Sequence, residues 1–167
     1  MFDWLALLDS CAPGVHPQTM TLLVRHESRA RPWAIGVNNG YRLKWQPRTK
    51  QEAVATANAL ANAGFSFDIG LAQINSANVR KLGLNYNQAF DPCTNLRIGS
   101  YLLSENYARA IKRYPEPNTA LHHALSAYNT GNMTSGLKNG YVAKVLGNYA
   151  LPMAIPASKR SINPTKN

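Results

Sequence analysis

Glu27 is the residue of this sequence whose surroundings best suit acid–base chemistry. In the segment Pro17–Ser28, the residues three, four and seven positions before it are apolar: Val24, Leu23 and Met20. This is the spacing of one helix face, so we expect the carboxyl group where that apolar face continues. Burial raises the pKa of a carboxyl group, and the negative end of the helix dipole acts in the same direction. A carboxyl that keeps its proton near neutral pH is what a general acid needs.

A structural role for Glu27 is an equal alternative on spacing alone. Three arginines lie close in sequence: Arg25, Arg29 and Arg31. Arg25 and Arg29 belong to other sides of the helix, but a long side chain can swing across and form an ion pair. Such a pair would hold the carboxyl charged and unavailable as an acid.

Two later segments place polar groups where they could contact a ligand. Asp68–Asn75 alternates apolar with polar residues and ends where a helix is expected to begin. Gln73 and Asn75 are therefore predicted at a strand-to-helix corner, where Gly70 lets the backbone approach a ligand closely. The alternative is a turn whose amides bind their own backbone. Tyr128 ends an amphipathic helix, and its hydroxyl group could reach a carboxyl or be satisfied within the core.

Metal chemistry is not indicated by the histidines and cysteines. The histidines have no metal-ligand spacing; they are His16, His26, His122 and His123. The two cysteines, Cys11 and Cys93, are far apart, so we expect neither a metal nor another cofactor. One disulfide in an oxidising compartment suits an even pair, with two reduced thiols as the alternative. The disulfide would close a loop of about eighty residues, worth roughly 4 kcal/mol.

The elements that must position these residues are mostly helices. Periodicity and capping signals predict helices at Phe2–Ser10, Pro17–Ser28, from the capping box Thr49–Glu52 to Gly64, from Asn75 or Ser76 to Gly83, from Asp91-Pro92 to before Pro115, from Asn118 to about Tyr128, and at Tyr141–Leu151.

The segment between the second and third of these helices has a β pattern. Ala34–Val37 and Tyr41–Trp45 flank the turn Asn38–Gly40 and are expected to pair as a small hairpin. Phe65–Ile69 also reads as extended. The fold class that follows is α+β, with helix in the majority.

The length and composition of the chain indicate a single domain. The chain has 167 residues, 45% of them hydrophobic, which is enough for a sizeable core. We expect this domain over residues 1–151 and a flexible basic tail over residues 152–167, where no acidic residue appears. No apolar run approaches the ~20 residues that cross a bilayer. Trp4–Leu8 is too short for a signal-peptide core, and Asp3 and Asp9 flank it, so no secretory signal is visible.

The charge of the chain indicates a polyanionic partner. The formal net charge is +10, from 18 basic and 8 acidic residues. Nucleic acid, acidic lipid head groups and an acidic cell-wall polymer would all be attracted to such a surface. Because the basic residues are scattered, we expect no specific nucleic-acid partner.

Three segments together resemble the lytic transglycosylases of the SLT, or goose-type-lysozyme-like, superfamily. They are Glu27-Ser28, Asp68–Asn75 and Ala127–Gly131, and they occur in the order of that family's motifs. The branch associated with type IV secretion and conjugation is more similar still. That likeness is carried by Cys11-Ala12-Pro13 with His16-Pro17, and by Asp91–Gly99. The resemblance covers about residues 10–150.

The resemblance implies a lysozyme-like fold with a small sheet beside the catalytic cleft. The implied substrate is the β-1,4 bond between N-acetylmuramic acid and N-acetylglucosamine in peptidoglycan, with Glu27 as general acid and Ser28 and Tyr128 orienting it. A 1,6-anhydro end would form instead of a hydrolysed one. The implied groove residues are Gly70, Leu71, Gln73, Asn75 and Asn129. Where the family usually has methionine this chain has Ala72, which would remove apolar contact from the groove.

The resemblance further implies export to the periplasm and type IV secretion or conjugation components as partners. Two alternatives stay open. One is a muramidase of the same fold that uses water, with Asp68 or a positioned solvent molecule completing the site; Asp68 is the credible second carboxylate, and ordinary glycosidases use two. The other is a noncatalytic basic module that binds glycan, DNA or assembly partners.

Overall fold

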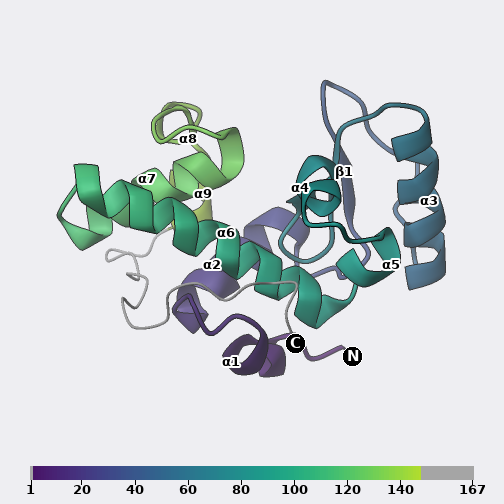
Figure 1. Ribbon diagram of the computed structural model, residues 1–167, viewed down its shortest axis with the longest axis horizontal. Helices are drawn as coiled ribbons and strands as arrows, with labels where there is room; N and C mark the ends of the chain where they lie inside the picture. Colours follow the sequence, from purple (N-terminus) through teal and green to yellow (C-terminus); the bar gives the residue numbers. More distant parts are fainter. Residues whose placement is uncertain (1, 148–167) are drawn as a thin grey trace.

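The computed structural model describes residues 2–147. A long helix, α6, runs through the molecule and joins two groups of elements (Figure 1). Its bounds and those of the other elements are η1 (Leu5–Leu7, a 3-10 helix), α1 (Leu8–Cys11), α2 (Pro17–Ser28), β1 (Ile35–Val37), α3 (Lys50–Asn62), β2 (Phe67–Ile69), β3 (Ile74–Asn75), α4 (Ser76–Lys81), α5 (Tyr86–Ala89), α6 (Pro92–Arg113), α7 (Pro117–Thr130), α8 (Ser135–Lys138) and α9 (Tyr141–Leu146). The predicted α+β class with a helical majority is confirmed.

The helix that carries Glu27 has the bounds that the sequence predicts. Pro17 occupies the first turn of α2, where its missing N–H costs nothing, and the His16 ring accepts a hydrogen bond from the Gln18 N–H. The apolar face of α2 is completely buried. The helix ends in a left-handed residue, Arg29, with φ of +54°, one residue after Ser28. Glu27 therefore lies in the last turn of a firmly anchored helix.

The small sheet has the antiparallel order β1-β2-β3. Ile35 lies opposite Ile69 in the first pair, and Asp68 lies opposite Asn75 in the second. The predicted pairing of Ala34–Val37 with Tyr41–Trp45 is wrong, because β1 pairs with β2 and Tyr41–Trp45 forms no strand.

Burial explains this pairing. Phe67 and Ile69 of β2 are fully buried, whereas Tyr41 and Trp45 are 60% and 76% exposed. The other edge of β1 is closed by a side chain, since the Gln46 amide accepts from the Ile35 N–H and donates to the Ile35 carbonyl. The exposed strand edge is thus satisfied without a fourth strand.

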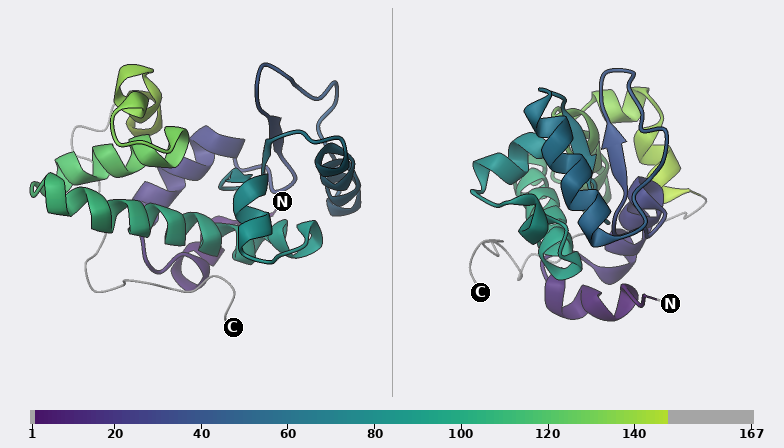
Figure 2. Two further views of the ribbon diagram at one scale, coloured as in Figure 1. Left: turned by 45° about the horizontal axis from the view of Figure 1, so that its top comes forward. Right: turned by 90° about the vertical axis from the view of Figure 1, so that its right-hand side faces the viewer.

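Helix α6 contributes residues to both parts of a divided hydrophobic core, and Figure 2 shows this helix reaching from one group of elements to the other. One part joins α1, α2, α7 and α9, and the α6 residues Leu96 and Leu103 belong to it. The other joins the sheet with α3, α4 and α5, and Ile98 of α6 belongs to it. Opposite faces of one helix therefore hold the two groups of elements together, and a site between them is anchored on both sides.

Asn95 of α6 fixes the corner between β2 and β3. Its fully buried amide donates to the carbonyls of Ile69 and Ala89 and accepts from the Ala72 N–H at 2.8 Å. A Cβ on Gly70, which has φ of +78°, would lie 2.3 Å from the Asn95 nitrogen. The corner therefore requires a glycine at this position and the amide beneath it.

We predict that Asn95→Ala lowers the free energy of unfolding by about 2 kcal/mol, because it leaves buried backbone groups without partners. Urea denaturation followed by circular dichroism measures this difference. Asn87→Ala, on the exposed side of α5, is the control and should change it by less than about 0.5 kcal/mol. Equal stabilities of the two variants would contradict this role.

The remaining differences from the predicted elements are local. Residues Phe2–Ser10 form η1 and the start of α1 instead of one helix, and the short helices α5 and α8 were not predicted. Cys11 and Cys93 form a disulfide that ties α1 to the start of α6, 82 positions apart. Helix α9 ends at Leu146; the rest of the predicted helix to Leu151 and the predicted tail at residues 152–167 lie outside the described residues.

Candidate active site

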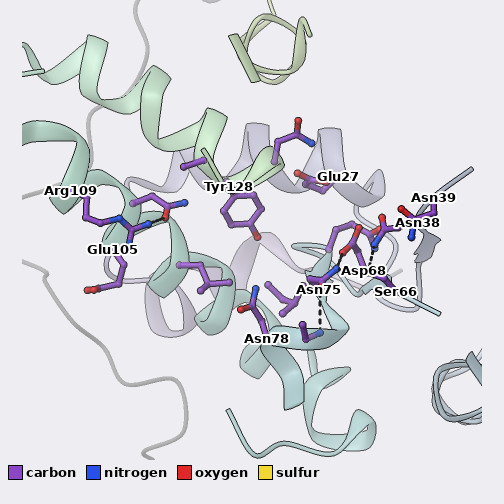
Figure 3. A pocket seen from close by; sticks show the side chains of 18 residues that line it. Glu27, Asn38, Asn39, Ser66, Asp68, Asn75, Asn78, Glu105, Arg109 and Tyr128 are labelled. Atoms are coloured by element: carbon purple, nitrogen blue, oxygen red, sulfur yellow. Dashed lines mark hydrogen bonds between the residues drawn. The ribbon is translucent and has the colours of Figure 1, made fainter. Parts of the chain in front are cut away.

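A cleft of about 680 Å³ lies between the two groups of elements (Figure 3). Glu27 comes to it from α2, Asp68 and Asn75 from the sheet, and Tyr128 from α7. Half of the other lining residues carry an amide or a hydroxyl, and two on α6 are charged; these polar residues are Asn38, Asn39, Ser66, Gln73, Asn78, Glu105, Asn106, Arg109 and Asn129. The rest are Ile74, Ala77, Leu102, Ala127 and Gly131. Neutral donors and acceptors of this kind suit a ligand rich in hydroxyl and acetamido groups.

Glu27 is held by a phenol and not by an arginine. The Tyr141 hydroxyl donates a hydrogen bond to Glu27 Oε1. Arg31, one of the three possible cationic partners, donates through Nε to the Ser28 carbonyl instead. Within residues 2–147, no Lys or Arg forms an ion pair with Glu27. The ion-pair alternative therefore does not describe this structure.

The surroundings of Glu27 raise its pKa from 4.5 to about 7. Burial is the largest cause, and the nearby Asp68 carboxylate acts in the same direction, whereas the hydrogen bond from Tyr141 opposes both. At neutral pH a large share of Glu27 is consequently protonated and able to donate a proton.

Asp68 is the second carboxyl group of the cleft. Its Oδ1 accepts from the Asn75 amide at 2.8 Å, which fixes it on the sheet, and Figure 3 shows it on the side of the cleft facing Glu27. Burial raises the pKa of Asp68, while hydrogen bonds from Asn75 and Asn38 oppose this shift. Two carboxyl groups thus share one cleft with different partners.

Ser28 and Tyr128 lie beside Glu27 but make their hydrogen bonds elsewhere. The Ser28 hydroxyl donates to the Val24 carbonyl at 3.2 Å, within α2. The Tyr128 hydroxyl donates to the Ala72 carbonyl at 2.6 Å, across to the sheet. The charge of Glu27 and, above all, burial raise the pKa of Tyr128 well above its usual value, so this phenol stays neutral. Any influence of Tyr128 on Glu27 is through space.

The structure brings three of the five predicted groove residues to the cleft, namely Gln73, Asn75 and Asn129. Gln73 and Asn75 also bind their own corner, as the turn alternative expected: Gln73 Nε2 donates to the Ala34 and Gly70 carbonyls. Gly70 and Leu71 are not among the residues that line the cleft, and both are buried. Their placement supports the corner and does not offer contact with a ligand.

Ala72 also lies away from the groove surface. It is fully buried, and a Cβ on Gly99 of α6 would lie only 2.6 Å from the Ala72 Cβ. The expectation that the small side chain removes apolar contact from the groove is therefore wrong. Ala72 acts through close packing against α6 and through its carbonyl, which receives the Tyr128 hydroxyl.

Tyr141 is a candidate site residue that the sequence did not predict. It is buried at the start of α9, where the Asn139 side chain accepts a hydrogen bond from its backbone N–H. Its ring packs edge-on against the His26 ring, with the two ring centroids 5.1 Å apart. The hydrogen bond to Glu27 joins residues 114 positions apart. A helix start after Asn139-Gly140 was the only local signal at this position.

We predict that Tyr141→Phe moves the alkaline limb of any Glu27-dependent activity to higher pH. The hydrogen bond from Tyr141 lowers the pKa of Glu27, so its loss raises that pKa above about 7. The maximal rate should fall about tenfold, because the carboxylate left after proton transfer loses one donor. The pH profile of the rate measures both effects.

Tyr101→Phe on α6 is the matched control for this substitution, since Tyr101 is not part of the cleft lining. An alkaline limb that stays in place in Tyr141→Phe would show that this phenol does not tune Glu27.

Among residues 2–147, no group of three or more His, Cys, Asp or Glu side chains is placed to hold a metal ion. In the same range, no helix has the length and apolar character needed to span a membrane.

The sequence of the chain matches one family model and several curated proteins. The family model described as the transglycosylase SLT domain matches residues 6–149. The type IV secretion system protein virB1 of Brucella abortus biovar 1 (strain 9-941) is 45% identical over 152 residues, which are 87% of this chain and 63% of the relative. The protein virB1 of Agrobacterium fabrum (strain C58) is 41% identical over 136 residues, 81% of this chain and 54% of the relative.

The chain thus spans between about half and two thirds of the length of these curated relatives. No solved structure matches it significantly. The family match includes both the helix that carries Glu27 and the helix that carries Tyr141. With its lysozyme-like α+β fold, the chain belongs to the transglycosylase SLT domain family.

Proposed function

We propose that this chain is a lytic transglycosylase that cleaves the β-1,4 bond between N-acetylmuramic acid and N-acetylglucosamine in peptidoglycan. The observation that carries the proposal is the state of Glu27: it opens into the cleft, has no cationic partner among residues 2–147, and has a pKa raised to about 7. Membership of the SLT family supplies the substrate class.

In the proposed mechanism, Glu27 donates its proton to the glycosidic oxygen as the bond to the muramoyl C1 breaks. The N-acetyl carbonyl of the same sugar stabilises the cationic C1 from within the substrate. The Glu27 carboxylate, steadied by the Tyr141 hydroxyl, then takes the proton of the C6 hydroxyl. The C6 oxygen closes on C1 and gives a 1,6-anhydro end, so Glu27 regains its proton and no water is consumed.

Hydrolysis by the same cleft is the second candidate, and Asp68 favours it. A second carboxylate on the side facing Glu27 is what glycosidases use to activate water or to stabilise a cationic intermediate. In that case water would add to C1, and the product would be an ordinary reducing end.

Digestion of purified sacculi, with the new ends identified by mass spectrometry, separates the two candidates. The transglycosylase proposal expects 1,6-anhydro-muramoyl ends, which are lighter by one water than reducing ends. Reducing ends alone would make the protein a muramidase. Absence of any soluble product would contradict both and favour a noncatalytic glycan-binding role.

We further propose that this cleavage opens the wall locally where a type IV secretion or conjugation apparatus is assembled, which places the protein in the periplasm. The names of the relatives support this setting, since the Brucella protein is called a type IV secretion system protein. Loss of conjugation or secretion in a strain that lacks the gene, restored by wild type but not by Glu27→Gln, would test it.

A further inference from the structure

The charged end of the cleft is formed by two residues of α6, Glu105 and Arg109, which we call the α6 charged pair. The α6 residue Gly99 lies under Tyr128, where a Cβ would be 3.1 Å from the hydroxyl oxygen. With a rise of 1.5 Å per residue, Glu105 and Arg109 lie roughly 9 and 15 Å further along the helix. The pair therefore lies beyond the sugar at which Glu27 would act.

The two side chains do not neutralise each other. Glu and Arg at positions i and i+4 of a helix are well placed for an ion pair. Arg109 nevertheless donates to the side-chain amide oxygen of Asn106 at 2.5 Å, and the Glu105 carboxylate points away from Arg109 (Figure 3). No hydrogen bond or ion pair of the Glu105 carboxylate occurs among residues 2–147. One free anion and one cation thus face the same end of the cleft.

Neutral sugars do not account for such a pair. N-acetylglucosamine is uncharged, and so is the sugar part of a muramic acid whose lactyl carboxyl group is joined to a stem peptide; the amides near Glu27 already match the hydroxyl and acetamido groups of both sugars. A carboxylate and a guanidinium that lose water to a neutral ligand are left without compensation. They are instead suited to a ligand that carries a carboxylate and an ammonium group a few ångströms apart.

We propose that the α6 charged pair binds the stem peptide attached to the muramic acid, with Glu105 receiving its free ammonium group and Arg109 a carboxylate. This inference rests on the proposed function and names the part of the substrate that distinguishes peptidoglycan from an unsubstituted glycan. The pair determines specificity and takes no part in bond cleavage.

The test compares kcat/KM for two glycan oligomers. One carries tetrapeptide stems; in the other the stems have been removed with an amidase and the exposed lactyl carboxyl groups have been converted to methyl amides, so that this oligomer carries no charge. Wild type should prefer the peptide-bearing oligomer. Glu105→Gln and Arg109→Gln should each lower the ratio of the two constants about tenfold, the value of one charge-assisted contact. Lys112→Gln, an exposed change on the same helix outside the cleft, should leave the ratio as in wild type.

Acetylation of the ammonium group of the stem assigns the two contacts. The kcat/KM ratio of wild type should then fall to that of Glu105→Gln. The ratio of Glu105→Gln itself should not fall further, because its contact with the ammonium group is already absent. The inference would be overturned if the kcat/KM ratio of both variants stayed within about twofold of the wild-type ratio. It would also be overturned if acetylation lowered the ratio of Glu105→Gln as much as it lowers that of wild type.

Failure of the proposed function can be told apart from failure of this inference. If wild type cleaves neither oligomer, the stem tetrapeptide is titrated into the protein with its N-terminal nitrogen acetylated, because that nitrogen is an amide in the substrate, and amide NMR shifts are followed. Shifts centred on Glu105 and Arg109, reduced in Glu105→Gln but not in Lys112→Gln, would support the peptide site alone. Absence of shifts there would overturn it.

Discussion

Glu27→Gln is expected to release muropeptides about a thousandfold more slowly than wild type while folding and binding glycan normally. The amide has the shape of the carboxyl and can still accept the hydrogen bond from Tyr141, but it has no proton to donate. The rate of soluble product release from sacculi, measured by chromatography, gives the ratio. Binding of the variant to insoluble peptidoglycan is measured in the same preparation.

The control for this loss is Asp9→Asn, the same carboxyl-to-amide change on an exposed helix residue outside the cleft. It should retain the wild-type rate within about twofold. Full activity in Glu27→Gln would discard the general-acid mechanism. Loss of both binding and activity would show that position 27 mainly supports the shape of the cleft.

Glu27→Gln is also expected to be more stable than wild type at alkaline pH. A carboxyl whose pKa rises from 4.5 to about 7 on folding favours the native state only while it is protonated. The stability it contributes is complete below pH 4.5 and is lost as the pH rises through 7. Glutamine has no such dependence, so the difference should grow to about 3 kcal/mol at pH 8 and vanish near pH 4.

Urea denaturation of both proteins at pH 4, 6 and 8 measures this difference. The sign matters as much as the size, because removal of an ordinary salt-bridged carboxylate would destabilise the protein at pH 8. A Glu27→Gln variant that is less stable than wild type at pH 8 would therefore contradict the conclusion that this carboxyl is buried without a cationic partner. The comparison also requires no substrate and is independent of the proposed reaction.

The local signals of the sequence predicted the helices well. The proline start and apolar spacing placed α2 within the correct bounds, and Thr49 caps α3 by accepting from the Glu52 N–H, as its pattern predicts. The hairpin failed although its turn is present, since Asn39 and Gly40 both have positive φ. Pairing was decided by the burial of Phe67 and Ile69, which depends on contacts distant in sequence.

Only part of the candidate site could be predicted, because the rest depends on contacts between residues that are distant in sequence. Glu27 was identified because its apolar neighbours share its helix, and Gln73 and Asn75 because they mark a corner. Tyr141 is 114 positions from Glu27, and no local pattern connects them. Leu71 was expected at the cleft from its motif, but its side chain turns into the core, a choice that only tertiary packing makes.

The proton on Glu27 can be observed directly by following the side-chain carboxyl ¹³C shift of this residue through a pH titration. A midpoint near pH 7 is predicted, with a rise above that value in Tyr141→Phe. A midpoint near 4.5 would mean that the carboxyl is charged in neutral solution, and the general acid on which the proposed chemistry depends would be absent.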